Sequence, residues 1–391
     1  MPPAWAALCL SLATASCSSC RRDASVEADA SMRAASSAPA TTISSWPVAS
    51  AGDSGAPRPG MAWIPPGAFR AGTPAGRTPR VADEEMPGTA VEMGGFYIDL
   101  LPWPNEPNAI PTSNVSRDEA EQLCTSKGKR LCTELEWERA CKGPESTTYE
   151  YGDTYRKEPC GTGVALELAA RRPTGEHAQC KSGFGVSEMH GGVWEWTSSA
   201  WGRGSRDAAQ GVLRGGNSPA GELVGRCANA IARSASKKSP TMGLRCCAGT
   251  KSAAEVKLEL LGTPGLTLAP PSHVNAWASA IVGAAKSGAS ALDPKFSHAW
   301  TWIPVANEAL VVAMGCTESP RGCGIVVARP SGDAGAGEIL TTITTGKDLS
   351  DVSRSGDARH LRIRSLDVRG VYSRELTYLY GRVDLGEPKR P

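Results

Sequence analysis

Residues 128–141 read GKRLCTELEWERAC and residues 184–197 read FGVSEMHGGVWEWT, and these two stretches decide the fold. In the first, Thr133 stands three residues before Glu136, which is the pattern of a capping box at the start of a helix. We expect this helix to run through Trp137 to Cys141. In the second, Trp194 and Trp196 flank Glu195, so a strand here places both indoles on one face. We expect these tryptophans to pack in the core, with ligand stacking by one of them as the alternative.

Further helices and strands are predicted elsewhere in the sequence. Ser116 and Glu119 form a second capping box, which predicts a helix over 117–124. Residues 60–69 read GMAWIPPGAF, a short strand interrupted by Pro-Pro-Gly, and residues 96–100 alternate as another strand. After Cys141 the pattern indicates turns and short strands.

Six blocks follow one another in a fixed order: GMAWIPPGAF, GKRLCTELEWERAC, YEYGD (149–153), FGVSEMHGGVWEWT, VLRGGN (212–217) and MGLRC (242–246). Together they resemble the FGE-sulfatase family, whose founding members are the formylglycine-generating, or sulfatase-modifying factor, enzymes. The resemblance covers residues 60–249. It implies an α+β fold of the FGE type, which is C-type-lectin-like, loop-rich and disulfide-bonded.

The chain contains 13 cysteines, a number typical of an exported, disulfide-bonded protein. The resemblance implies the bridges Cys124–Cys246 and Cys141–Cys227. Cys160 and Cys180 flank a polar loop and are expected to pair. If the Cys124–Cys246 bridge brings their segments together, Cys132 and Cys247 are the natural fourth pair. Cys316 and Cys323 flank a turn, and a disulfide between them would close a hairpin there.

The family's enzymes oxidise a substrate cysteine with O₂ at a Cu(I) ion held by two thiolates. The resemblance places these thiolates at Asn217 and Glu222, and residues 215–226 contain no cysteine. Because Cu(I) prefers soft sulfur ligands, we expect neither bound copper nor a catalytic residue here. The family's calcium site loses an asparagine at Gly192, which leaves Glu195 and main-chain carbonyls for at most weak calcium binding. We expect no other metal site, since the histidines show no ligand spacing.

The N-terminus predicts export. An apolar run from Ala4 to Ala15 precedes Cys17, and this arrangement resembles a bacterial lipoprotein signal with Cys17 as the lipidated residue. A secretory signal cleaved near Ala15 is the alternative. Residues 18–59 are an Ala/Ser/Pro-rich linker that we expect to be disordered. The expected location is therefore the bacterial envelope, facing the periplasm or the cell surface, with the membrane as a partner through the lipid anchor.

Residues 252–391 resemble no family that we recognise. A helix over 273–285 and strands over 300–314, 324–328, 339–344, 360–368 and 376–383 predict a β-rich domain, either a small sandwich or a barrel. Arg362 and Arg364 alternate with apolar residues, so we expect both side chains on one solvated strand face. The formal net charge of +2 gives no indication of a nucleic-acid partner.

These observations predict a non-catalytic binding or structural module of the cell envelope, with an unidentified protein or glycan as ligand. The candidate binding groove comprises Trp194, Glu195, Trp196, Trp201, Asn217 and Glu222. One alternative is a formylglycine-generating oxidase that converts a substrate cysteine to formylglycine, or a different oxidase built on Cys132 and Cys247. Another alternative is an inert structural lipoprotein without a ligand groove.

Overall fold

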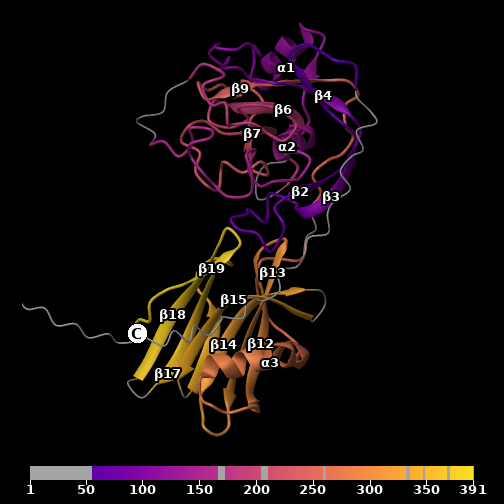
Figure 1. Cartoon of the computed structure of the whole chain (residues 1–391). Coiled ribbons are helices and arrows are strands. Elements are labelled where there is room, and N and C mark those ends of the chain that lie inside the picture. Colours follow the sequence, from indigo (N-terminus) through magenta and orange to yellow (C-terminus); the bar gives the residue numbers. More distant parts are fainter. Residues whose placement is uncertain are drawn as a thin grey trace, which may run out of the picture. The chain divides into compact units, whose positions relative to one another are not determined.

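The computed structural model describes residues 55–165, 172–203, 210–258, 261–331, 335–346, 348–367 and 370–390 (Figure 1). The predicted signal, Cys17 and nearly all of the linker lie outside the described residues. Within the described ranges, no helix has the length and apolar character needed to cross a bilayer.

Short elements joined by long loops form the central part of the chain (Figure 1). They are β1 (Met61–Ile64), β2 (Gly67–Gly72), β3 (Pro87–Met93), β4 (Phe96–Asp99), α1 (Arg117–Thr125), β5 (Arg130–Leu131), α2 (Glu134–Lys142), β6 (Trp194–Ala200), β7 (Gly211–Gly215), β8 (Ala230–Arg233), β9 (Met242–Leu244) and β10 (Cys246–Ala248). Their sheets have the strand orders β1-β4-β10-β5, β2-β3 and β8-β7-β6-β9.

Both predicted capping boxes are present. The Ser116 hydroxyl accepts a hydrogen bond from the Glu119 N–H at the start of α1, and the Thr133 hydroxyl accepts one from the Glu136 N–H at the start of α2. In each case the glutamate carboxylate accepts a hydrogen bond from the cap residue's N–H. The helices therefore begin where the sequence predicted, because the signal is local.

Helix α2 is buried on every side although it carries several charged residues. Glu138 pairs with Lys142 at 2.8 Å and with Arg214 at 3.1 Å, and Glu134 pairs with Arg214 at 2.9 Å. Burial raises the pKa of Glu138, but the charges of Lys142 and Arg214 outweigh this effect, and the pKa lies below its ordinary value. The helix can occupy the interior because its charges are paired there.

Two apolar clusters flank this polar centre. One joins Leu135 and Trp137 of α2 to Ile64, Phe69 and other residues of β1–β4. The other joins the inner face of α1 to Trp196, Leu213 and Leu244. The structure has five disulfides among the described residues, and they are the expected pairs: Cys124–Cys246, Cys132–Cys247, Cys141–Cys227, Cys160–Cys180 and Cys316–Cys323.

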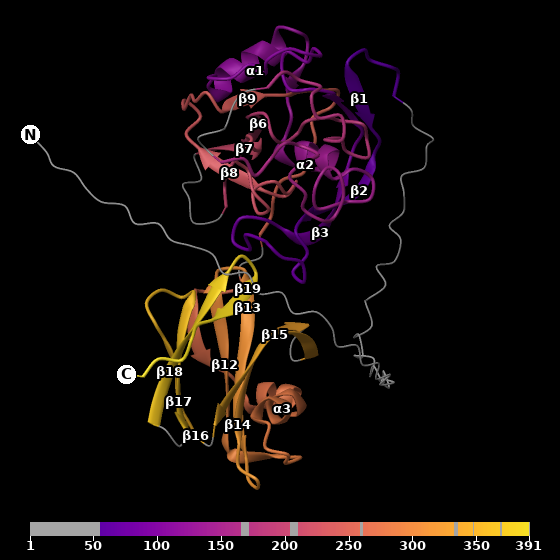
Figure 2. The same ribbon diagram turned by 60° about the vertical axis from the view of Figure 1, so that its left-hand side comes forward.

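The C-terminal part is a β-sandwich with one helix (Figure 2). Its elements are β11 (Gly265–Leu268), α3 (Pro271–Ala285), β12 (Leu292–Val305), β13 (Glu308–Thr317), β14 (Cys323–Ser331), β15 (Gly335–Gly346), β16 (Asp348–Arg354), β17 (His360–Asp367), β18 (Gly370–Leu379) and β19 (Arg382–Leu385). Strands β11–β15 and β16–β19 form the two antiparallel sheets in chain order.

Strand β13 shows how the layers are built. Leu310 and Val312 face the other sheet in one core cluster, whereas Val311 and Ala313 face α3 in another. Since successive side chains point to opposite faces, a strand between two layers must be apolar on both. This explains why residues 309–314 read ALVVAM without alternation.

The fold class is confirmed: a loop-rich, disulfide-bonded α+β part is followed by a β-rich part. Two strand predictions were wrong. Residues 300–314 belong to two strands that turn between Val305 and Glu308, and residues 376–383 divide at Tyr380 and Gly381. Strands β11 and β16 were not predicted. The first turn consists of Ala306 and Asn307 without glycine or proline, and such a short interruption between two apolar stretches did not mark the boundary.

Candidate functional site

Glu195 lies on β6, between the two indoles in sequence and on the opposite face of the strand. It is fully buried, and its carboxylate accepts hydrogen bonds from Trp137 Nε1 at 2.6 Å and from Arg245 Nε at 3.0 Å. Arg245 also donates to the Asp99 and Ser187 carbonyls. Burial raises the pKa of Glu195, and Arg245 and Trp137 oppose that shift. Both carboxylate oxygens are hydrogen-bonded, and a guanidinium group occupies the place where a cation would bind.

Trp196 packs in the core, as the sequence predicted, and Trp194 is partly buried against the same cluster. Both belong to the cluster around α1, and Trp196 is fully buried with its Nε1 donating to the Val115 carbonyl at 3.0 Å. Trp194 is half-buried. The face that the two indoles share is therefore occupied by protein.

Trp201 lines a separate cavity of about 670 Å³, together with residues 198–202 and 251–256. The tryptophan is 2 % exposed, and the Arg203 guanidinium lies 4.1 Å from the centre of its ring. Arg203 in turn pairs with Glu134 at 2.7 Å. This part of the predicted groove is thus a hollow beside the start of α2.

The segment from Asn217 to Glu222 lies against a cluster of tyrosines. Tyr149 donates its hydroxyl hydrogen to the Glu222 carbonyl at 3.2 Å, and its ring stacks with Tyr151 at 5.7 Å between centroids. Tyr155 packs beside Tyr149 at 5.6 Å. Burial raises the pKa of Tyr151 to about 12. The Glu222 side chain is exposed and Asn217 is half-buried.

The six residues of the predicted groove therefore occupy three different environments. Glu195 and Trp196 belong to the interior with Trp194 half-buried against them, Trp201 lines the cavity near α2, and Asn217 and Glu222 lie beside the tyrosines. The latter two environments offer most of the surface available to a ligand. The spacing in the sequence did not indicate this division, because it depends on how β6 and β7 pack against α1 and α2.

A cluster around Glu150 was missed by sequence reasoning. One oxygen of this buried carboxylate lies 2.9 Å from the Sγ atoms of both Cys160 and Cys180 and 3.3 Å from His190 Nδ1. The same carboxylate accepts hydrogen bonds from the N–H groups of Met189 and His190. Glu150 and His190 lie 40 residues apart, and no motif connects them.

Gly191 connects this cluster to the segment that contains Asn217. Its N–H donates to the Gly216 carbonyl at 2.8 Å, and its φ is +90°. A Cβ atom at this position would lie 2.0 Å from the Cys160 carbonyl oxygen, so only glycine fits. Gly191 therefore contacts both Cys160 of the Cys160–Cys180 disulfide and the segment that contains Asn217.

No described cysteine carries a free thiol, since all ten belong to the five disulfides. The oxidase built on Cys132 and Cys247 would need these two residues in their reduced form, whereas the structure has them bridged. At Asn217 and Glu222 the chain offers an amide and a carboxylate, which are hard oxygen donors.

Residues 102–249 match the family model described as the sulfatase-modifying factor enzyme 1-like domain (FGE-sulfatase). Among similar proteins, hercynine oxygenase of Mycolicibacterium thermoresistibile is 36 % identical over 29 % of this chain and 24 % of its own length. Formylglycine-generating enzyme of Mus musculus is 35 % identical over 23 % of this chain and 27 % of its own. Inactive C-alpha-formylglycine-generating enzyme 2 of Bos taurus is 27 % identical over 36 % of this chain and 50 % of its own.

The matched part of the chain thus spans between a quarter and a half of the length of these relatives. Their names describe two different activities and one inactive protein, so membership does not assign a reaction to this chain. Five of the six ordered sequence blocks lie within the residues that the family model matches, and the first block, at 60–69, precedes them. Residues 102–249 of this chain belong to the FGE-sulfatase family.

Proposed function

We propose that this protein is a non-catalytic binding or structural module built on an FGE-sulfatase domain. The observation that carries the proposal is the chemistry at the two family thiolate positions, where Asn217 and Glu222 stand. The pairing of every described cysteine in a disulfide supports it, because no other described thiols are available to replace them. The inactive relative from Bos taurus is a precedent for a domain of this family without activity.

The proposed ligand is a protein or a glycan, and the surface beside Asn217, Glu222 and the tyrosines is its proposed site. Tyr151 and Tyr155 are half-buried, and next to a carboxylate and an amide they can stack against a ligand and hydrogen-bond to it. In this proposal the protein holds no cofactor and binds calcium at most weakly.

The alternative is a formylglycine-generating oxidase, and a single assay separates the two. The full chain is incubated with Cu(I), O₂ and a peptide that carries a sulfatase motif, and aldehyde is measured with a hydrazide probe and by mass spectrometry. We expect no aldehyde above the level without protein. The Asn217→Cys/Glu222→Cys variant is the matched control, because it restores sulfur at both positions in the same scaffold. Aldehyde formed by the unaltered chain would refute the non-catalytic proposal.

We further propose that the chain is exported and held in the bacterial envelope by a lipid on Cys17. The expected result is that the unaltered protein partitions into the detergent phase and incorporates radiolabelled palmitate in a bacterial host. A Cys17→Ser variant should lose the label and move to the aqueous phase, whereas a Cys20→Ser variant should behave as the unaltered protein. Retention of the label by Cys17→Ser would show that another residue carries the lipid, and an unaltered chain without label in the aqueous phase would favour the cleaved secretory signal.

A further inference from the structure

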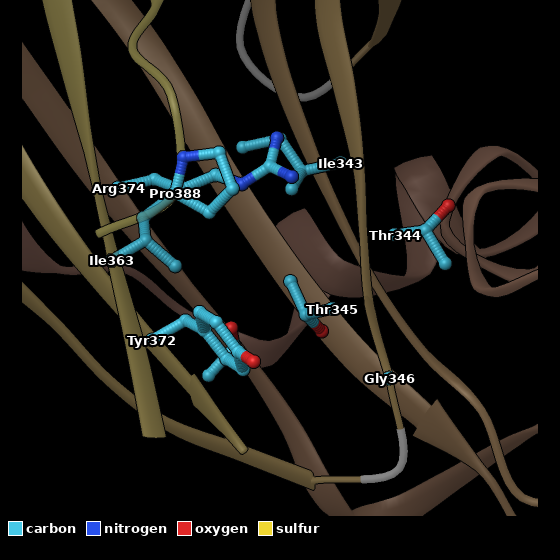
Figure 3. A pocket seen from close by; sticks show the side chains of 9 residues that line it. Ile343, Thr344, Thr345, Gly346, Ile363, Tyr372, Arg374 and Pro388 are labelled. Atoms are coloured by element: carbon cyan, nitrogen blue, oxygen red, sulfur yellow. The ribbon is translucent and has the colours of Figure 1, made fainter. Parts of the chain in front are cut away.

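The C-terminal sandwich contains a cavity of about 240 Å³ where strand β15 of one sheet faces β17 and β18 of the other. Figure 3 shows its lining: Ile343 and Thr345 come from β15, and Ile363, Tyr372 and Arg374 come from the facing sheet. Pro388 covers one side. The segment that carries it is held in place by two hydrogen bonds of 2.8 Å between the backbones of Ser373 and Lys389.

Arg374 belongs to the inner face of its sheet. Along β18 it shares a face with Leu376 and Tyr378, which are 0 % and 3 % exposed in the sandwich core. Its partner across the strands is Ile363, which is also a core residue. Figure 3 shows the Arg374 side chain reaching across the cavity toward Ile343. By contrast, Arg364 is exposed, since the alternation of β17 places it on the opposite face.

The Arg374 guanidinium has no hydrogen-bond or ion-pair partner among the described residues. Other arginines of this sandwich are paired: Arg329 binds Glu308 at 2.7 Å, and Arg362 donates to the Ser355 hydroxyl at 3.0 Å. The Arg374 side chain is half-buried, so its guanidinium is partly hydrated and stays available to an anion that enters the cavity. An anion bound in the cavity would supply a counter-charge.

A buried hydroxyl also lacks a partner. Thr345 Oγ1 makes no hydrogen bond within the described structure, although the residue is only 6 % exposed. Its neighbour Thr344 points to the other face of β15 and donates to the Ala284 carbonyl of α3 at 2.7 Å. Tyr372 accepts a hydrogen bond from Arg390 at 3.3 Å and retains its own hydroxyl hydrogen for donation. Buried polar atoms are normally satisfied, so the unmatched Thr345 hydroxyl in a cavity that Arg374 also lines points to a ligand there.

We propose that this cavity binds a small organic molecule through one oxyanion group, a carboxylate or a phosphate. The planar guanidinium of Arg374 donates to two oxygens at once, and the hydroxyls of Thr345 and Tyr372 donate to the same group. Ile343, Ile363 and Pro388 contact the apolar body of the ligand. The volume is below that of ordinary drug-sized sites, which favours a small molecule over a peptide or a polymer.

The test titrates the full chain with isobutyrate and, separately, with inorganic phosphate at constant ionic strength in chloride, by isothermal calorimetry. We expect saturable binding of at least one anion at one site per chain. Binding of isobutyrate alone assigns a carboxylate ligand, and binding of phosphate alone assigns a phosphorylated one. Arg374→Met should weaken binding by at least about tenfold, as expected when a hydrogen bond to a charged group is lost. Arg364→Met is the matched control and should bind as the unaltered chain does.

Thr345→Val keeps the shape of the side chain and removes the hydroxyl, so it tests the site without altering its charge. It should weaken binding by about twofold to tenfold, the range for a neutral hydrogen bond. This variant also serves if Arg374→Met does not fold, which its circular dichroism spectrum would reveal. Absence of binding by both anions, or equal affinity in the unaltered chain and both variants, would overturn the proposal. Neither outcome bears on the aldehyde assay, since the cavity lies outside the FGE-sulfatase domain.

Discussion

Replacing Glu195 by alanine is expected to lower the free energy of unfolding by about 3 to 5 kcal/mol, the range measured when one partner of a buried ion pair is removed. The carboxylate is 1 % exposed, and Arg245 beside it is equally buried. Without Glu195 the guanidinium keeps its hydrogen bonds to main-chain carbonyls but loses its counter-charge. Trp137 also loses the acceptor for its indole N–H. The substitution therefore leaves two buried donors, Trp137 Nε1 and Arg245 Nε, without an acceptor.

The measurement is urea unfolding of the purified chain, followed by tryptophan fluorescence. Glu195→Gln should be less damaging than Glu195→Ala, because the amide oxygen still accepts a hydrogen bond from Trp137 while the charge is removed. Lys238→Ala is the surface control: Lys238 pairs with Glu119, and both side chains are more than 40 % exposed. Exposed pairs contribute little, so this variant should unfold at nearly the same urea concentration as the unaltered chain. Equal midpoints for Glu195→Ala and Lys238→Ala would show that the buried pair contributes no net stability.

The sequence predicted those parts of the fold that depend on residues close together in the chain. The capping boxes at Ser116 and Thr133 involve residues three positions apart, and both helices begin where these boxes predicted. The hairpin turn between Val305 and Glu308 was missed because β13 is apolar on both faces and adjoins another apolar strand. A strand buried between two layers removes the alternation on which strand boundaries are recognised.

The candidate site was less predictable, because its contacts join residues that are far apart in the sequence. The sequence indicated which chemistry was absent, since the lack of cysteine in residues 215–226 is visible without a structure. It did not indicate that Glu195 would bind Arg245, 50 residues away, or that Glu150 would approach Cys160 and Cys180. Likewise, the sequence predicted that Arg362 and Arg364 share a solvated face, but it did not indicate that Arg374 on the next strand faces inward. Long-range packing decides which polar groups are left unmatched, and pattern rules act over only a few residues.

Removal of disulfides is expected to cause the second large loss in the free energy of unfolding. Because two of the bridges join neighbouring cysteines, their contributions should not be additive. Cys124–Cys246 and Cys132–Cys247 close loops with sequence separations of 122 and 115 residues. Taken singly, each would restrict the unfolded chain by about 5 kcal/mol in the loop-entropy model. Yet Cys246 and Cys247 are adjacent, and Cys132 follows Cys124 by eight residues. Once one bridge is present, the other closes a ring of only roughly ten residues, which is worth about 2.5 to 3 kcal/mol in the same model.

The Cys124→Ala/Cys246→Ala and Cys132→Ala/Cys247→Ala variants should therefore each lose about 2.5 to 3 kcal/mol, whereas the variant with all four substitutions should lose about 6 to 7 kcal/mol. The combined loss exceeds the sum because the first removal leaves a larger ring closed, which runs through the Cys141–Cys227 bridge over roughly 30 to 40 residues, and only the second removal opens that ring. Urea unfolding of the three variants measures the difference. Cys316→Ala/Cys323→Ala is the control, since its bridge spans seven residues of a single hairpin and shares no ring with the others. A four-fold variant that lost no more than the sum of the two pairs would mean that native-state strain or residual structure in the unfolded chain, not loop closure, determines what these bridges contribute.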